Sequence, residues 1–503
     1  MNQLTGLMVL APALAALIAL ARPRPSLLRR AFVGGVMAGL LGVALWMVGH
    51  VQTAGPLVLR VGGWLSPYGI VLVADTLAAV MLALAAFTAL ACALYGFAEM
   101  SAEDEHPLRL PLWLFLLAGI NLSFVTGDLF NLFVAFEVML LASYALLTLE
   151  TDARGTRQAL PYLTINLVGS AVFLAAAGYT YSLLGTLNFA EIIVRSAALE
   201  GDFRLTLLAV VLLFVFGLKA GIFPLYYWLP KSYPILPAPT AAFYAGMLTK
   251  VGVYVLIRMT GTVLPPTLET VHALLAWLAG FTMVFGVLGA VAQMRVQSIL
   301  SYHIVSQIGF MVLAIGLFTP FAFAAAIFYI IHHIVVKAAL FLAGGIIKRV
   351  NGTDDLAKTG GLWRVAPWLG ILFLLQAMSL AGLPPLSGFW GKFMIIQEGL
   401  RLGEWTLVGM SLVASVLTLM SMLKIWLGAF WRDEAAAPVR WDARAKGMTV
   451  IGLGMVGVSL GIGLGAGKVF QTAEHAARET LDRAGYVEAV RAANTINHEG
   501  KHP

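Results

Sequence analysis

Seven charged side chains lie within stretches of sequence that are otherwise apolar enough to cross a membrane. They are the lysines Lys219, Lys250, Lys337, Lys392 and Lys424 and the acids Glu137 and Asp75. A charge in hydrocarbon costs at least about 2.5–3.5 kcal/mol, so such residues normally face a partner or a water-filled cavity. Lysines outnumber acids, which argues against simple buried ion pairs. A lysine poised between its charged and neutral forms accepts and releases a proton, so the pattern predicts a proton path.

For two of these residues, a role unrelated to transport explains their position in an apolar span equally well. Lys424 lies seven residues before the predicted end of its span, so snorkelling of its ammonium group to the membrane surface is an even alternative. For Asp75, a structural hydrogen-bonding role is at least as well supported as transport. Lys219, Lys250 and Glu137 lie near the middle of their predicted spans, where snorkelling fails. Structural ion pairing is the remaining alternative there, and a proton path is favoured over it.

Three histidines add groups that titrate near neutrality. His332 and His333 precede Lys337, and His333 shares a helical face with that lysine one turn away. His303 lies in LSYHIVSQIGF, with a serine and a glutamine following on its face. A lone histidine in a membrane is often only a packed hydrogen-bonding group, whereas a histidine stacked on a buried lysine favours a proton relay. No metal-ligand cluster and no glycine-rich nucleotide loop is present, so we expect no metal, no cofactor and no enzymatic bond chemistry.

Proline and glycine interrupt two of the apolar spans. The first interruption occupies residues 217–240 and the second residues 380–392. FPLYYWLPK (223–231) and PPLSGFWGK (384–392) share Pro, Leu and Lys in register, 161 residues apart. Each interruption falls in the fourth span of a predicted five-span block, and an odd number of spans makes the second block inverted relative to the first. Paired broken helices in two inverted halves indicate a transport site.

Composition and hydropathy place these residues in an all-helical membrane protein. Of the 503 residues 60% are hydrophobic and only 11% charged, which excludes a soluble enzyme, a disordered chain and a nucleic-acid-binding protein. At roughly 20 apolar residues per span, fourteen spans are predicted. They are 4–21, 31–49, 68–95, 109–126, 128–150, 158–184, 205–229, 238–260, 269–292, 297–318, 321–347, 366–400, 405–431 and 447–466.

The basic loops predict the orientation of these spans. If the first loop is cytoplasmic, alternate loops hold 17 Lys and Arg on the cytoplasmic side and 5 on the other, so the N-terminus lies outside. This asymmetry also explains the net charge of +7 without an anionic ligand. We expect four parts: N-terminal helices (1–108), a first inverted repeat (109–260), a second inverted repeat (261–431), and a last span with a C-terminal surface helix that ends near Asn494 (432–503).

The interrupted spans and their neighbours resemble a known family. NLFVAFEVMLLASYALL, GLKAGIFPLYYWLPKSYP, AGMLTKVGVYVLIR, SYHIVSQIGF, FYIIHHIVVKAALF and LAGLPPLSGFWGKF are similar to the antiporter-like subunits shared by Mrp-type cation/proton antiporters and respiratory complex I. The D-type branch of the Mrp antiporter subunits is the most similar, and the resemblance covers essentially the whole chain. It implies a fourteen-helix fold with two inverted five-helix repeats and a row of Glu, Lys and His near the middle of the membrane.

The resemblance also implies roles for individual residues. Glu137 and Lys219 match a switchable ion pair, Lys250 a bridging lysine, and His333 with Lys337 a relay in the eleventh helix. The row ends at a lysine of the twelfth helix, which is Lys392. Lys231 departs from the family's charge row and receives no role.

The resemblance implies partners for this chain, and several alternative functions remain to be compared with it. Implied partners are the other membrane subunits of an Mrp complex in a bacterial cytoplasmic membrane, with Na⁺ or K⁺ moved by the complex rather than by this lysine-rich chain. One rival is a proton pump in complex I or a membrane-bound hydrogenase. Another is an energising membrane partner of a soluble enzyme, such as an inorganic-carbon-trapping complex. The last is a scaffold without ion flux.

Overall fold

The computed structural model describes residues 1–432 and 440–495. Within these residues, twelve helices are long and apolar enough to cross a membrane. Two shorter apolar helices, α4 (Arg109–Val125) and α15 (Pro367–Ala381), lie among them. The twelve helices are α1 (Gln3–Ala21), α2 (Leu27–Ala54), α3 (Thr76–Glu99), α5 (Leu129–Glu150), α6 (Ala153–Leu184), α8 (Phe203–Ala220), α10 (Ala238–Arg258), α11 (Glu269–Ala292), α12 (Val296–Gly316), α13 (Pro320–Asn351), α17 (Trp405–Ile425) and α18 (Ala443–Leu464). The prediction of a helical, multi-pass membrane protein is confirmed.

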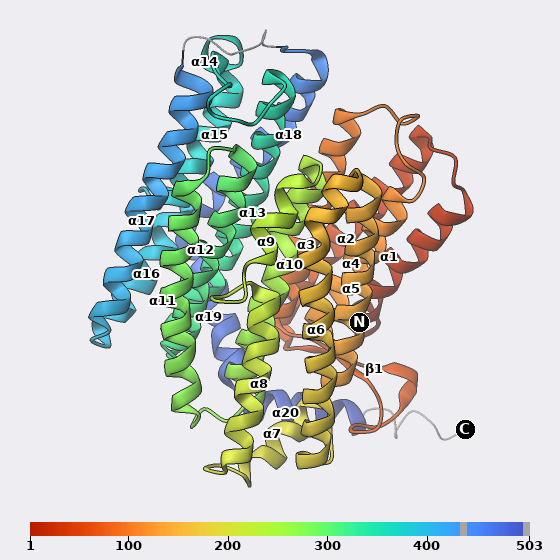
Figure 1. Cartoon of the computed structure of the whole chain (residues 1–503). Coiled ribbons are helices and arrows are strands. Elements are labelled where there is room, and N and C mark those ends of the chain that lie inside the picture. Colours follow the sequence, from red (N-terminus) through yellow and green to blue (C-terminus); the bar gives the residue numbers. More distant parts are fainter. Residues whose placement is uncertain (433–439, 496–503) are drawn as a thin grey trace.

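Shorter elements connect and cover the bundle. They are α7 (Phe189–Ala197), α9 (Trp228–Ser232), α14 (Leu362–Val365), α16 (Ser387–Arg401), α19 (Ala466–Leu481), α20 (Arg483–Thr495) and the strands β1 (Leu57–Arg60) and β2 (Val71–Ala74). Figure 1 shows α14 at one end of the bundle and α7, α20 and β1 at the other. The long helices run between these two ends, so a residue near the middle of a helix lies far from both ends of the bundle.

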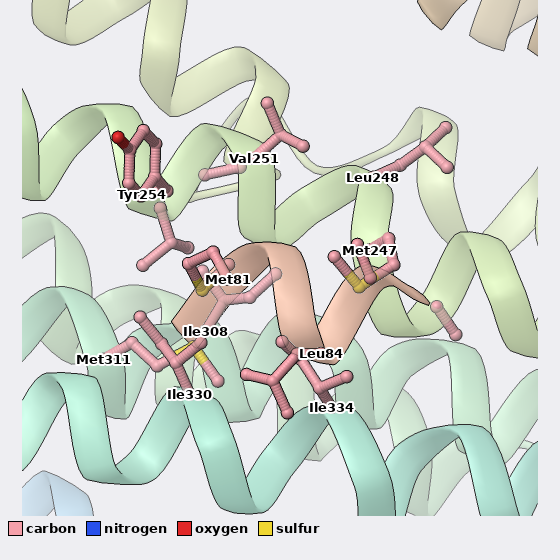
Figure 2. Close-up of a cluster of buried hydrophobic side chains, with 14 of the residues drawn as sticks. Met81, Leu84, Met247, Leu248, Val251, Tyr254, Ile308, Met311, Ile330 and Ile334 are labelled. Carbon is pink, nitrogen blue, oxygen red and sulfur yellow. The ribbon is translucent and has the colours of Figure 1, made fainter. Parts of the chain in front are cut away.

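Helix α13 is the central element of the bundle. Its membrane-length segment and that of α10 are wholly buried, whereas only 28% of that of α2 is buried. Figure 2 shows where α3, α10, α12 and α13 meet in an apolar cluster that includes Met81, Leu84, Met247, Val251, Ile308, Met311, Ile330 and Ile334. Lys250 and Lys337 lie on two of these four helices, α10 and α13. The surrounding apolar packing therefore fixes the two helices that carry these charged residues.

The predicted span 68–95 is wrong at its beginning. Residues 71–74 form β2, which pairs antiparallel with β1, and helix α3 starts only at Thr76. Valine and leucine in this segment suit a strand as well as a membrane helix, so hydropathy alone does not separate the two. Asp75 then sets the first turn of α3, because its Oδ1 accepts a hydrogen bond from the backbone N–H of Ala78 (2.9 Å).

The single surface helix predicted for the tail is also wrong. The segment forms two helices, α19 and α20, that separate at Asp482. Asp482 has non-helical backbone angles, and its carboxylate caps the next helix at Gly485. Alanines of α19 pack against the bundle, with Ala473 and Ala476 fully buried. The remainder of the predicted C-terminal part, residues 496–503, lies outside the described residues.

Candidate proton path

Glycines end α8 and α15 in the same way. Gly221 (φ 79°) and Gly382 (φ 94°) adopt left-handed backbone angles, and each N–H donates to the carbonyls three and four residues earlier. This helix ending favours glycine because a Cβ would be strained there. A proline follows each glycine three residues later, at Pro224 and Pro385. The two helices are therefore broken at positions 161 residues apart, as the sequence pattern predicts.

Lys219 lies two residues before the first break and is buried. Its Nζ donates weak hydrogen bonds to Asn166 Oδ1 (3.4 Å) and Ser170 Oγ (3.5 Å) of α6, and lies 5.7 Å from the centre of the Phe136 ring. Glu137, the next residue on α5, acts electrostatically on Lys219, but the two form no ion pair within 4 Å. Glu137 Oε1 is buried without a hydrogen-bond partner among the described residues.

A glycine brings the first break close to α10. A Cβ at Gly252 would lie 2.8 Å from the Ala220 Cα, so only glycine allows the end of α8 to pack this tightly. Two residues earlier, Lys250 is fully buried. Its Nζ donates to the Ala245 carbonyl (2.7 Å) and to Thr249 Oγ1 (3.2 Å). Lys250 is therefore held on its own helix rather than by an acid.

The predicted relay on α13 is fully buried. His333 and Lys337 have 0% exposure. Neither ring nitrogen of His333 has a hydrogen-bond partner among the described residues, and the same holds for Lys337 Nζ. Lys250, His332, Lys337 and Lys392 all lie near enough to act electrostatically on His333. The structure therefore gathers four other predicted residues around His333, while Glu137 and Lys219 form a separate group on α5 and α8.

The second break carries Lys392 and contacts His332. Lys392 is buried on α16, its Nζ donating to the Ala381 carbonyl at the end of α15 (3.0 Å) and lying 4.7 Å from the centre of the Phe310 ring. His332 Nδ1 is 2.7 Å from the Ser387 hydroxyl oxygen, in the first residue of α16. The break thus exposes both a helix-end carbonyl and a hydroxyl to titratable side chains.

His303 lies beside this group, on α12. Its Nε2 is 2.5 Å from Ser421 Oγ of α17. One turn later, Gln307 donates to Thr418 Oγ1 (3.4 Å) and accepts a hydrogen bond from the Tyr329 hydroxyl. These contacts satisfy one ring nitrogen of His303 and line this part of the interior with hydroxyl groups.

Sequence analysis missed the polar partners of the titratable residues. Asn166 and Ser170 are one turn apart in an apolar helix, which is a signal that the sequence does contain. Ser387 and Ser421 carry no comparable signal, because their histidine partners lie 55 and 118 positions away in the chain. Hydroxyl groups matter here because each one both donates and accepts a hydrogen bond.

The two remaining charged residues of the predicted spans, Asp75 and Lys424, have direct hydrogen-bond partners. Both carboxylate oxygens of Asp75 pair with Arg258, at 2.6 and 2.9 Å, while one also caps α3. Lys424 Nζ donates to the Val291 carbonyl (2.7 Å) at the end of α11. Among the described residues, no group of three or more His, Cys, Asp or Glu side chains is placed to hold a metal ion.

Comparison with known proteins identifies the family of this chain. Residues 126–418, more than half of its length, match the family described as NADH:quinone oxidoreductase/Mrp antiporter, TM. The chain belongs to this family. A Na(+)/H(+) antiporter protein from Alkalihalophilus pseudofirmus, named as the D subunit, is 41% identical over 490 residues, covering 97% of this chain and 99% of that protein. Its namesake in Bacillus subtilis is 38% identical over 496 residues, with 97% and 99% covered.

The structural comparison agrees. A chain from the structure of the Mrp complex from Dietzia sp. DQ12-45-1b superposes with a TM-score of 0.91 at 30% identity, covering 97% of this chain and 99% of that one. The resemblance to the Mrp D subunits, within the superfamily shared with complex I, is confirmed. The chain is therefore an antiporter-like, multi-pass membrane subunit of a transporter family.

Proposed function

We propose that this subunit moves protons within a multisubunit Na⁺ or K⁺/proton antiporter. The proton-transfer residues are the eight titratable side chains predicted from the sequence, Glu137, Lys219, Lys250, His303, His332, His333, Lys337 and Lys392. The observation that carries the proposal is the burial of four lysines and three histidines in a single bundle, most of them without a partner of opposite charge. In a structural ion pair each charge has a direct partner of opposite sign, as Asp75 and Arg258 have in this structure.

The switch is the pair formed by Glu137 and Lys219. Two opposite charges about 4 Å apart attract by about 4 kcal/mol at an effective dielectric constant of about 20, and Glu137 and Lys219, which lie beyond that distance, attract more weakly. Loss of the Lys219 proton removes that attraction and leaves the lysine with only two long hydrogen bonds to α6. The change in charge then alters the hydration and proton affinity of the next group in the row, Lys250.

Protons pass from Lys250 through His333 and Lys337 to Lys392. The side chains are on different helices and do not touch in one continuous chain of hydrogen bonds. Buried polar groups require partners, and both His333 nitrogens and Lys337 Nζ have none among the described residues. Water molecules therefore bridge these gaps. His332 and His303 join the same route through the hydroxyls of Ser387 and Ser421.

The topology of the proposal follows the charge distribution. With α4 and α15 counted as spanning, fourteen helices cross a bacterial cytoplasmic membrane, and the N-terminus lies outside because most basic loops lie inside. The repeats are 109–260 and 261–431, preceded by 1–108 and followed by 432–503, with the second repeat inverted. Other membrane subunits of an Mrp complex are the partners, and they supply the cation route.

Everted vesicles test this function. The chain is expressed with the subunits encoded beside it in an antiporter-deficient host, the vesicles are energised, and dequenching of a ΔpH dye is recorded on addition of Na⁺ or K⁺. Lys219→Ala is expected to reduce the response to background, because no titratable group then remains opposite Glu137. Lys446→Ala, which removes an exposed lysine that is not one of the proposed proton-transfer residues, serves as the matched control.

The outcomes separate the alternatives. A cation response that disappears in Lys219→Ala but persists in Lys446→Ala, with equal assembly by immunoblot, supports the proposal. A response unchanged by Lys219→Ala would leave this chain as a scaffold. No response in the wild-type complex favours a redox-driven pump or a partner of a soluble enzyme.

A further inference from the structure

A cavity of about 780 Å³ opens beside the first broken helix. It lies where the junction of α5 and α6, the short helix α9, the first residues of α12 and the end of α13 meet. Four basic side chains from four different segments line it: Arg157, Lys231, Arg295 and Lys348. The volume is that of a small-molecule site rather than of a gap between side chains.

The described acids near this cavity neutralise only part of the charge of its four cations. Asp152 lines it, but its Oδ1 accepts a hydrogen bond from the Gly155 backbone N–H (2.7 Å) as the cap of α6. Asp354 pairs with Arg295 at 2.8 Å. No acidic side chain described by the structure lies within ion-pair distance of the other three cations.

These three cations are exposed and carry no ion pair among the described residues. Arg157, Lys231 and Lys348 all face solvent at the cavity, and Lys231 Nζ donates to the Tyr227 hydroxyl. The preference of basic residues for one side of a membrane explains their presence on this face. It does not explain their convergence on one cavity, because like charges that face each other repel.

We infer that this cavity binds a phosphate-bearing anion. Arginine offers a planar fork of donors and lysine a compact charge, and both recognise phosphate oxygens. Basic pockets between membrane helices on the cytoplasmic side are typical sites for anionic lipid headgroups. A phospholipid headgroup and a soluble phosphate compound present the same chemistry here, and the cavity has room for more than one phosphate group.

The anion would bridge the two halves of the chain. Arg157 and Lys231 precede residue 260, whereas Arg295 and Lys348 follow it. Lys231 lies on α9, the segment directly after the break that follows Lys219. A bound phosphate therefore ties α9 to α6, α12 and α13 and restrains the broken helix from its outer end. None of the four cations belongs to the proposed proton row.

A binding measurement on the purified complex tests the site. The complex in neutral detergent is titrated at constant ionic strength with inorganic phosphate, dioctanoyl phosphatidylglycerol or zwitterionic dioctanoyl phosphatidylcholine, and binding is followed by thermophoresis. Lys231→Gln/Lys348→Gln is expected to weaken anion binding by about 30-fold, and Arg157→Gln alone by about fivefold. Lys358→Gln/Lys446→Gln is the control, since it removes two exposed lysines outside the cavity.

Each result is decisive. Saturable binding of phosphate or phosphatidylglycerol that weakens in the cavity variants and not in the control supports the site. Binding of the lipid alone identifies a headgroup as the source, and binding of inorganic phosphate identifies a soluble ligand. The inference is overturned if neither anion binds saturably, if phosphatidylcholine binds equally well, or if the control variant loses as much affinity as the cavity variant.

Discussion

The two broken helices share their backbone geometry and differ in where they place lysine. Lys392, ten residues after the glycine of the second break, is buried. The residue 161 positions earlier in the chain is Lys231, which is exposed. Conversely, buried Lys219 corresponds to Leu380 in the second break. The same backbone geometry thus occurs twice, but the buried lysine lies before the break in the first half (Lys219) and after the break in the second (Lys392).

The helices that follow the two breaks also differ in length and in the direction in which each presents its lysine. Helix α16 continues for 15 residues, so Lys392 in its second turn remains inside the bundle. Helix α9 has only 5 residues, of which four are buried, and Lys231 is the one that faces outward. A break is present in both halves, but the face of the following helix on which the lysine lies decides whether that lysine is buried or solvated.

The two halves also differ in electrostatics. The first combines a lysine with an acid, Glu137, whereas the charged groups that act on His333 are all bases. An opposite charge makes the first half suitable for switching. A group of bases repels a second positive charge, so under the proposed function the other half would pass one proton at a time.

The largest expected effect comes from Lys392→Arg, which keeps the positive charge of the second break but removes its neutral form. A guanidinium does not lose its proton in a protein, so proton transfer through this position stops. Cation-dependent dequenching in everted vesicles should fall to background although the complex assembles. Normal dequenching would show that Lys392 acts only through its charge, and the contrast between the two breaks would then lose its functional meaning.

A smaller effect is expected from Ser387→Ala, which removes the hydroxyl contact of His332 and leaves the imidazole in place. One hydrogen bond contributes about 1 kcal/mol, so the initial rate of dequenching should fall about fivefold. Ser415→Ala, on α17, is the control, because its hydroxyl donates to a carbonyl of its own helix. If both substitutions slow transport equally, the Ser387 contact has no special part in the second half.

The smallest effect on transport is expected from Asp75→Asn, which breaks the ion pair with Arg258 and leaves Glu137 and Lys219 unchanged. Removing one partner leaves a buried charge unpaired and costs about 3–5 kcal/mol of stability. The melting temperature and yield of the complex should fall, while the dequenching rate per assembled complex stays unchanged. A lost response at normal assembly would place Asp75 in the proton path.

Much of this protein was predictable because charge and hydropathy are local properties of a sequence. The apolar spans, both proline-interrupted helices and the eight titratable residues follow from one-dimensional patterns, since a charge in a long apolar run must be sheltered wherever the helices pack. The hairpin at 71–74 and the division of the tail at Asp482 were missed, because a short apolar or alanine-rich segment fits more than one backbone conformation.

Only the tertiary structure decided which side chains contact one another. The sequence by itself determined which side chains are costly to bury and where the helices break. It did not determine that Ser387 meets His332, that Asp75 closes on Arg258, or that Lys231 joins a basic cavity while Lys392 lies inside. These contacts join segments far apart in the chain, and they depend on helix lengths and close packing at residues such as Gly252, which no local pattern encodes.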